Sequence, residues 1–133
     1  MSNEAILSAI EKRLARNLRK QVQKGLAEVF ELSNCTAVGR EIRAGKNVTG
    51  NAEWGIRYCI HQKTAPRVDP STLKFTRQTK KAKKLDEKFI KLTNDMLETG
   101  GFPKLPSDLL SSMRKKDREF ERDISERRRK RGK

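Results

Sequence analysis

EAILSAIEKRLARNLRKQVQKGLAEVFEL, residues 4–32, is the stretch that decides the architecture. Its apolar side chains recur every three or four positions, which is the spacing of one face of an α-helix. We therefore expect a single long amphipathic helix over 4–32, ended by Ser33-Asn34. The apolar face consists of Leu7, Ile10, Leu14, Leu18, Val22, Leu26 and Val29.

A pattern typical of β-strands follows in residues 36–63. The runs 36–43 and 53–61 flank a Gly- and Asn-rich stretch, and the second run alternates large apolar residues with smaller or polar ones. We expect a β-hairpin with a long turn that packs on the N-terminal helix, since a lone hairpin is marginal in water. Its inward face would carry Trp54, Ile56, Tyr58 and Ile60, and its outward face Arg57 and His61. The alternative, in which exposed aromatic rings stack on nucleobases, stays open.

The second half of the chain predicts two further helices. After a polar connector at 64–78, apolar residues at helical spacing predict a helix over 79–99, and Gly100-Gly101 is a typical stop. A last helix over 108–127 has a thin apolar face, which Asp117 interrupts. The block 127–133 consists almost entirely of Arg and Lys, so we expect it to be disordered by itself.

Together these elements define the predicted fold class. It is α+β and mostly helical, with a long N-terminal amphipathic helix, a central β-hairpin, two C-terminal helices and a basic disordered tail. Residues 1–106 are expected to form a small basic domain, and residues 107–133 a C-terminal basic helix and tail. A length of 133 residues and a hydrophobic content of 34% allow only a modest core.

Positive charge is the strongest functional signal. Lys and Arg number 32 against 17 Asp and Glu, which gives a formal net charge of +15. Residues 40–84 hold twelve of these cations and three acids, so the excess is not confined to the tail. Concentrated charge of one sign costs self-repulsion, which a polyanion relieves. Nucleic acid is the predicted partner, because cations that dock on its phosphates release counterions.

The candidate binding residues are spread over the middle of the chain and the tail. Lysines at the start of the helix 79–99 interact unfavourably with the positive end of the helix dipole. Phosphates that dock at this helix start would offset that cost. A dispersed basic surface without a helix-turn-helix pattern favours RNA slightly over DNA. The predicted nucleic-acid-binding residues are Arg43, Lys46, Arg57, Lys63, Arg67, Lys74, Arg77, Lys80, Lys81, Lys83, Lys84, Arg127, Arg128, Arg129, Lys130 and Arg131.

Catalytic and metal chemistry have little support in the sequence. His61 is the only histidine, and with Cys35 and Cys59 it supplies at most three soft ligands, one fewer than a structural zinc site uses. A Cys59–His61 pair lacks a third, orienting group, and no Gly-rich nucleotide-binding loop occurs. We therefore expect no enzymatic activity, no metal and no cofactor.

The sequence also bears on the compartment. No apolar run is long enough for a transmembrane helix, and the start lacks the pattern of a secretory signal, so no membrane association is expected. Two cysteines give no disulfide framework, which favours reduced thiols. The expected location is the cytoplasm, or the nucleus or nucleolus of a eukaryotic cell.

One alternative function is that of an adaptor or assembly subunit of a ribonucleoprotein or nucleoprotein complex. The apolar face of helix 4–32 or of helix 108–127 would then bind a protein partner or a second copy. Another alternative is a basic amphipathic helix that binds a membrane surface or a calmodulin-like protein. It explains residues 4–32 but not the charge at the centre of the chain.

Overall fold

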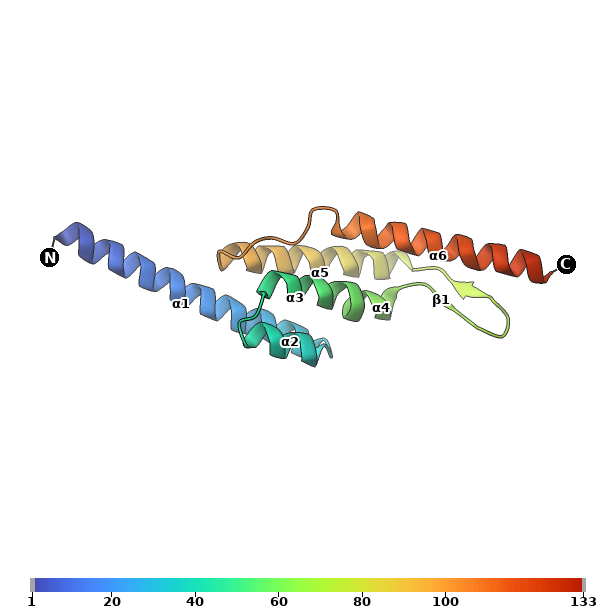
Figure 1. The fold of residues 1–133 in the computed structure, drawn as a ribbon, viewed down its shortest axis with the longest axis horizontal. Coiled ribbons are helices and arrows are strands. Elements are labelled where there is room, and N and C mark those ends of the chain that lie inside the picture. Colours follow the sequence, from blue (N-terminus) through green and yellow to red (C-terminus); the bar gives the residue numbers. More distant parts are fainter. Residues whose placement is uncertain (1, 133) are drawn as a thin grey trace.

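The computed structural model describes residues 2–132 and is elongated, with the two termini at opposite ends (Figure 1). Helices dominate it, and a short antiparallel pair of strands lies between the N-terminal and C-terminal helices, which confirms the mostly helical α+β class. The elements are α1 (Asn3–Leu32), α2 (Thr36–Arg43), α3 (Val48–Gly55), the π-helical turn η1 (Ile56–Ile60), α4 (His61–Thr64), β1 (Arg67–Val68), β2 (Phe75–Thr76), α5 (Lys80–Thr99) and α6 (Leu109–Arg131).

The long N-terminal helix is confirmed. The Ser2 hydroxyl caps α1 by accepting a hydrogen bond from the backbone N–H of Ala5, and Asn34 ends the turn after it with a φ of 63°. Only the C-terminal part of α1 enters the core, where Leu26 and Phe30 are fully buried. All residues from 2 to 21 are exposed, and this half of the helix extends beyond the rest of the protein (Figure 1).

The prediction of a hairpin over 36–63 is wrong, because α2, α3, η1 and α4 occupy this region. The Asn47 side chain caps α3 by accepting a hydrogen bond from the backbone N–H of Gly50. Ala52, Ile56 and Ile60 then fall four residues apart on one buried helical face. A residue pattern with a period of two also repeats every four positions, so the alternation over 53–61 did not distinguish a strand from a helix.

Two glycines let the helices of this region pack closely on their neighbours. A Cβ atom at Gly39 would lie 2.7 Å from the carbonyl oxygen of Ala27, and one at Gly55 would lie 2.7 Å from the ring of Phe30. Both glycines therefore let α2 and α3 approach α1 more closely than any larger residue would allow. The sequence pattern offers no direct sign of this use of glycine.

The hairpin that does form lies in the predicted connector. β1 and β2 pair antiparallel, with Arg67 opposite Thr76 and Val68 opposite Phe75. The Asp69 carboxylate organises the turn by accepting hydrogen bonds from the backbone N–H of Ser71 at 2.9 Å and from its hydroxyl at 2.7 Å. The strands have two residues each, too few for an alternating pattern to be visible in the sequence.

Both C-terminal helices are present. Thr79 caps α5, and Gly101, with a φ of 73°, follows its last turn, as expected for the pair Gly100-Gly101. The prediction of a disordered tail is wrong for residues 127–131, which form the last turns of α6, while Lys133 lies outside the described residues. Cations suit a helix C-terminus because they offset the negative end of its dipole. Arg131 also donates a hydrogen bond to the carbonyl oxygen of Ser71 at 3.1 Å.

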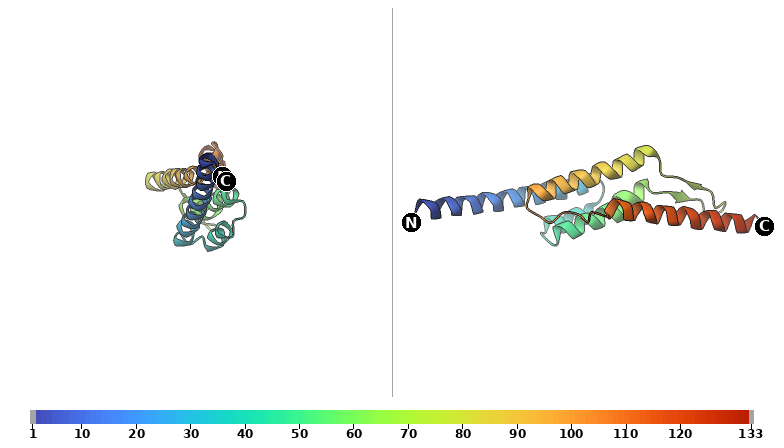
Figure 2. Two further views of the ribbon diagram at one scale, coloured as in Figure 1. Left: turned by 90° about the vertical axis from the view of Figure 1, so that its left-hand side faces the viewer. Right: turned by 90° about the horizontal axis from the view of Figure 1, so that it is seen from above.

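The core lies where the C-terminal half of α1 meets α2, α3, α5 and the start of α6 (Figure 2). The rings of Phe30 and Phe89 meet edge to face at 5.4 Å between centroids. From α6, Leu109 and Met113 are buried in the same cluster. Within residues 2–132, no helix has both the length and the apolar content that crossing a bilayer requires.

Cys35 and Cys59 form a disulfide, so the expectation of reduced thiols is wrong for this structure. The packing of η1 beside the start of α2 brings their Cα atoms to 6.1 Å. The two positions are 24 residues apart in the chain, and their spacing alone did not reveal this proximity. A bond that closes a loop of this size typically stabilises a fold by about 2–4 kcal/mol.

Candidate nucleic-acid interface

A concave surface lined by four cations lies between the end of α4, the hairpin and the start of α5. Its volume is about 440 Å³, and no acidic residue lines it. The remainder of its wall combines three apolar side chains with uncharged polar ones, namely Ala65, Ala82 and Leu85 with Thr64, Thr76, Gln78 and Thr79. We call it the basic groove, and its cations are Lys63, Arg67, Arg77 and Lys81.

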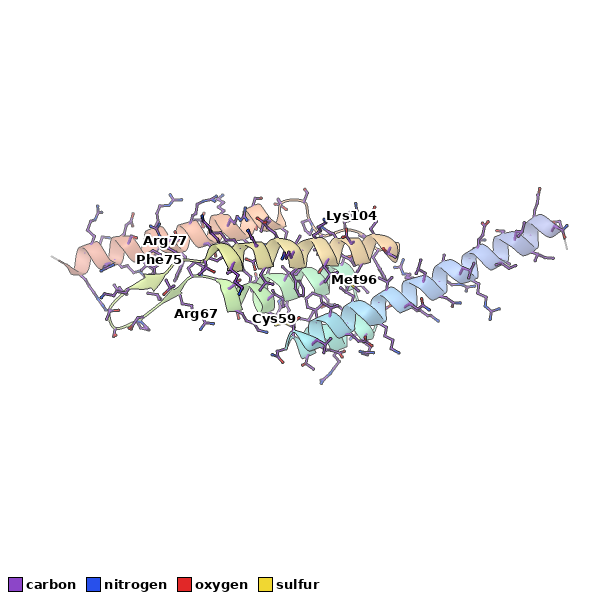
Figure 3. The ribbon with its side chains drawn as sticks, turned by 180° about the vertical axis from the view of Figure 1, so that it is seen from behind. Cys59, Arg67, Phe75, Arg77, Met96 and Lys104 are labelled. Atoms are coloured by element: carbon purple, nitrogen blue, oxygen red, sulfur yellow. A yellow bond between two sulfur atoms is a disulfide. The ribbon has the colours of Figure 1, made fainter. Side chains whose placement is uncertain are left out.

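Secondary structure sets the backbone positions of these four residues. Lys63 lies in the last turn of α4 and donates a hydrogen bond to the carbonyl oxygen of Ser33. Arg67 belongs to β1 and Arg77 follows β2, and both line the groove. Figure 3 labels the two residues beside the hairpin. Lys81 lies in the first turn of α5, whose dipole adds partial positive charge to the groove.

More cations lie near this end of the molecule. Lys83 of α5 lines a neighbouring hollow together with Arg114 and Arg118 of α6, beside the carboxylates of Asp117 and Glu121. The hydrogen bond from Arg131 to the hairpin shows that the basic block of α6 approaches the same hairpin as the groove. The structure therefore places Lys81 of α5 beside Arg67 and Arg77 in one groove, and it brings Arg131 of the block 127–131 to the turn of the same hairpin. Lys74, Lys80 and Lys84 are exposed in this region.

Three predicted binding residues lie elsewhere and are already paired with acids. Arg43 contacts the carboxylate of Glu31 through two hydrogen bonds of 3.1 Å. Lys46 lies 3.9 Å from Glu41. Arg57, which is half-buried, donates to Glu53 at 3.1 Å and to the hydroxyl of Ser112 at 2.8 Å. Each of these three side chains therefore has an acidic neighbour that competes with phosphate, although the pair of Lys46 is largely exposed.

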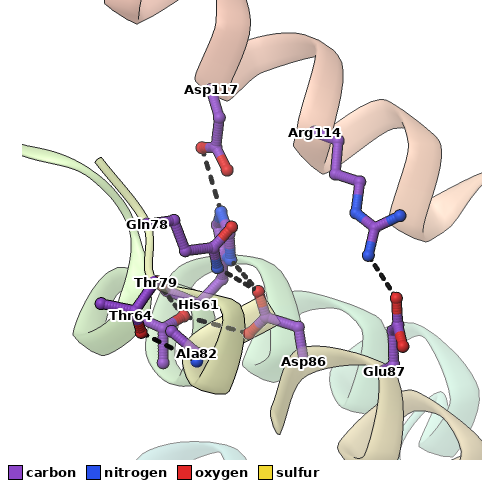
Figure 4. Close-up of polar contacts among 9 residues, drawn as sticks. All are labelled: His61, Thr64, Gln78, Thr79, Ala82, Asp86, Glu87, Arg114 and Asp117. Carbon is purple, nitrogen blue, oxygen red and sulfur yellow. Dashed lines mark hydrogen bonds and ion pairs between the residues drawn. The ribbon is translucent and has the colours of Figure 1, made fainter. Parts of the chain in front are cut away.

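His61 is the centre of a buried polar cluster that joins three helices (Figure 4). Its Nδ1 lies 2.8 Å from Oδ2 of Asp86 on α5, and its Nε2 lies 3.1 Å from Oδ1 of Asp117 on α6. Thr64 donates to the other Asp86 oxygen at 3.0 Å, and Gln78 donates to Oδ2 at 2.7 Å. The expectation that His61 lies on an exposed face is therefore wrong, because only 8% of it is exposed.

The charge of His61 follows from its partners. Its hydrogen bond to Asp86 is the largest cause that raises the pKa of His61, the hydrogen bond to Asp117 adds to it, and burial opposes both. An imidazolium donates from both ring nitrogens, which suits a ring placed between two carboxylates. The cluster therefore ties α5 and α6 to α4 beside the basic groove. The second oxygen of Asp117, Oδ2, is buried without a hydrogen-bond partner.

The aromatic residues are also placed differently from the expectation. Trp54 and Tyr58 were predicted to face the core, but 52% of Trp54 and 48% of Tyr58 are exposed. In a helical conformation they lie four residues apart, on the face opposite the buried Ile56. The sequence signal for this placement is the spacing. Trp54 and Tyr58 are four residues apart, as are Ala52, Ile56 and Ile60, and two such series offset by two residues lie on opposite faces of a helix.

Two further observations concern other kinds of site. Within residues 2–132, no three His, Cys, Asp or Glu side chains come together in a way that could hold a metal ion. The sulfur of Cys59 is bonded to that of Cys35, so it is not available as a thiol ligand or nucleophile beside His61 in this structure. No family model matches the chain, and neither curated proteins nor solved structures show significant similarity to it.

Proposed function

We propose that this chain is a non-enzymatic nucleic-acid-binding protein that holds phosphates mainly at the basic groove and the cations around it. The single observation that carries the proposal is that Lys63, Arg67, Arg77 and Lys81 line one concave surface without any acid in its lining. Cations gathered on one folded wall can contact neighbouring phosphates together, because their backbone positions are set before binding. The net charge of +15 adds long-range attraction for a polyanion.

RNA is the favoured ligand, with DNA as the alternative. A dispersed basic surface without a helix-turn-helix pattern suits a folded or single-stranded RNA, and phosphate contacts set position without sequence preference. Such a protein would work in the cytoplasm, or in the nucleus or nucleolus of a eukaryotic cell. In those compartments the Cys35–Cys59 bond would face reducing conditions.

The test is a competition experiment at one stated salt concentration. A labelled structured RNA is bound to the purified chain, and unlabelled structured RNA, single-stranded RNA and duplex DNA are compared as competitors. We expect the RNA competitors to displace the label at lower concentration than the duplex. Failure of every nucleic acid to bind in dilute buffer would overturn the proposal.

A second function, the binding of another helix, is favoured by the exposed apolar face in the N-terminal half of α1. Five large apolar residues there are between 43% and 62% exposed, although burial of such side chains is the main source of stability for a helix. A patch of this kind is typical of an interaction surface. Its members are Ile6, Leu7, Ile10, Leu14 and Leu18.

This surface predicts self-association. We expect the wild-type chain to sediment as a dimer at high protein concentration, because pairing two such faces removes them from water. Replacing Ile10 and Leu14 with Glu should give a monomer with an unchanged core, since neither residue contributes to it. A wild-type chain that remains monomeric would contradict self-association as the role of this face.

A further inference from the structure

The exposed aromatic pair has a geometry that the basic groove does not use. Trp54 is in the last turn of α3 and Tyr58 is in η1, and their ring centroids are 5.8 Å apart with a tilt of 45° between the planes. About half of each residue is exposed, although moving an aromatic ring out of water lowers the free energy of the protein. The pair therefore offers flat π-surface to a ligand.

A hollow of about 480 Å³ surrounds these rings. Residues from α3 and η1 form one side, and Ser112 and Lys116 of α6 form the other. Arg57 is fixed on the wall beside the rings, because Glu53 accepts from it at 3.1 Å and Ser112 at 2.8 Å. The rings thus lie beside a polar wall that is ordered before any ligand arrives. The full lining is Gly50, Glu53, Trp54, Arg57, Tyr58, Ser112 and Lys116.

The charges of the hollow indicate what it accepts. The Glu53 carboxylate is matched by Arg57, which leaves the ammonium of Lys116 as the uncompensated charge of the lining. Within residues 2–132, Lys116 forms no ion pair. A ligand that combines a flat ring with a nearby negative charge is complementary to this surface, and an unpaired nucleotide has both.

We propose that Trp54 and Tyr58 form a stacking platform for an unpaired nucleobase, with Lys116 contacting an adjacent phosphate. The base faces of a duplex are covered by neighbouring base pairs, so the platform selects single strands, loops or flipped-out bases. This inference rests on the proposed nucleic-acid-binding function and specifies its ligand class. Under this proposal the Trp54–Tyr58 platform, which is separate from the basic groove, determines the preference for unpaired bases.

Trp54 is the only tryptophan of the chain, so its fluorescence reports on the platform alone. The purified full chain is titrated in dilute buffer with a single-stranded oligonucleotide and with a duplex of the same total phosphate concentration. Anisotropy of a label on the nucleic acid measures binding independently. We expect the single strand to quench Trp54 at saturation, and the duplex to bind through the basic groove without quenching.

Substitutions provide the second arm of the test. Removing both rings, by Trp54→Ala with Tyr58→Ala, should weaken single-strand binding about tenfold or more, while duplex binding changes less than about twofold. Trp54→Phe, which keeps a stacking surface, should restore most of the affinity when Tyr58 is intact. Circular dichroism checks that each variant keeps its helices.

The outcomes separate the two proposals. If single strands bind tightly, leave the fluorescence unchanged and bind the double variant equally well, the platform is overturned and the basic groove still stands. That result would leave the aromatic pair to a protein partner. If neither nucleic acid binds the wild-type chain, the nucleic-acid-binding function fails together with the platform.

Discussion

Replacing the four cations of the basic groove with Gln should flatten the salt dependence of nucleic-acid binding by roughly 3 in the slope of log K against log salt concentration. Each phosphate contact releases counterions that contribute roughly 0.7–0.9 to this slope, so four lost contacts account for the change. The variant carries Lys63→Gln, Arg67→Gln, Arg77→Gln and Lys81→Gln. Affinity in dilute buffer should fall similarly for all sequences, because phosphate contacts carry no base preference.

A matched control separates the groove from net charge. The exposed polar side of α1 offers Lys12, Arg13, Arg16 and Lys20, and their replacement with Gln lowers the charge of the chain by the same amount. This control should keep most of the slope, since only diffuse attraction is reduced. Equal losses in both variants would show that binding depends on total charge and not on the groove.

Replacing His61 with Ala should destabilise the protein by about 3 kcal/mol, because it leaves the buried carboxylate of Asp86 and the half-buried carboxylate of Asp117 without their shared cation. Asp86 is 3% exposed, so water cannot fully replace the lost partner. Urea unfolding monitored by circular dichroism measures the difference. Gln62→Ala is the control, since this exposed neighbour on α4 makes no contact with the cluster.

The effect of His61 should depend on pH with a defined sign. Its pKa is raised in the folded protein, so folding favours the protonated ring. The stabilisation is fully present below the unfolded pKa of about 6.5 and is lost as the pH rises through the higher folded-state value. The free-energy gap between wild type and His61→Ala should therefore be larger at about pH 6 than at about pH 9. A gap that is constant over this range would mean that folding does not shift the pKa of His61.

The helices with a continuous apolar face could be predicted from the sequence. The apolar face from Leu7 to Val29 on α1 keeps a spacing of three or four residues over about six turns, which only a helix satisfies. Gly100-Gly101 marks the end of α5, because glycine readily adopts the backbone geometry that follows a helix. The exposure of Leu7 to Leu18 could not be predicted in the same way. Periodicity identifies an apolar face but does not say how far along the helix its partners extend.

The errors over 36–63 have one physical source. Ala52, Ile56 and Ile60 satisfy both a strand and a helix pattern over a short window, so the period alone does not choose between them. The close approach at Gly39 and Gly55 depends on tertiary contacts that the local pattern does not contain. A separate error concerns His61 and Asp117. The sequence did not indicate that they are partners, because they are 56 residues apart in the chain. In the sequence, Asp117 only interrupts the apolar face of the helix 108–127. Such an interruption is the signal that could have indicated an acid with a partner elsewhere in the chain.

The candidate site could be predicted as a composition but not as a surface. The cations of the hairpin region and the start of α5 were identified from charge alone, and strand pairing then determined that Arg67 and Arg77 share a wall with Lys81. Charge alone could not show that Arg43 and Arg57 already have acidic partners. Counting charges along a chain does not distinguish a cation that binds a ligand from one that neutralises a neighbour.

The most direct measurement is the affinity of the wild-type chain for a structured RNA as a function of salt concentration. Docking of phosphates on fixed cations predicts a straight line of log K against log salt with a negative slope, and a slope near −3 or steeper if the basic groove engages all four of its cations. Binding that is absent in dilute buffer, or that does not weaken as salt is added, would contradict it.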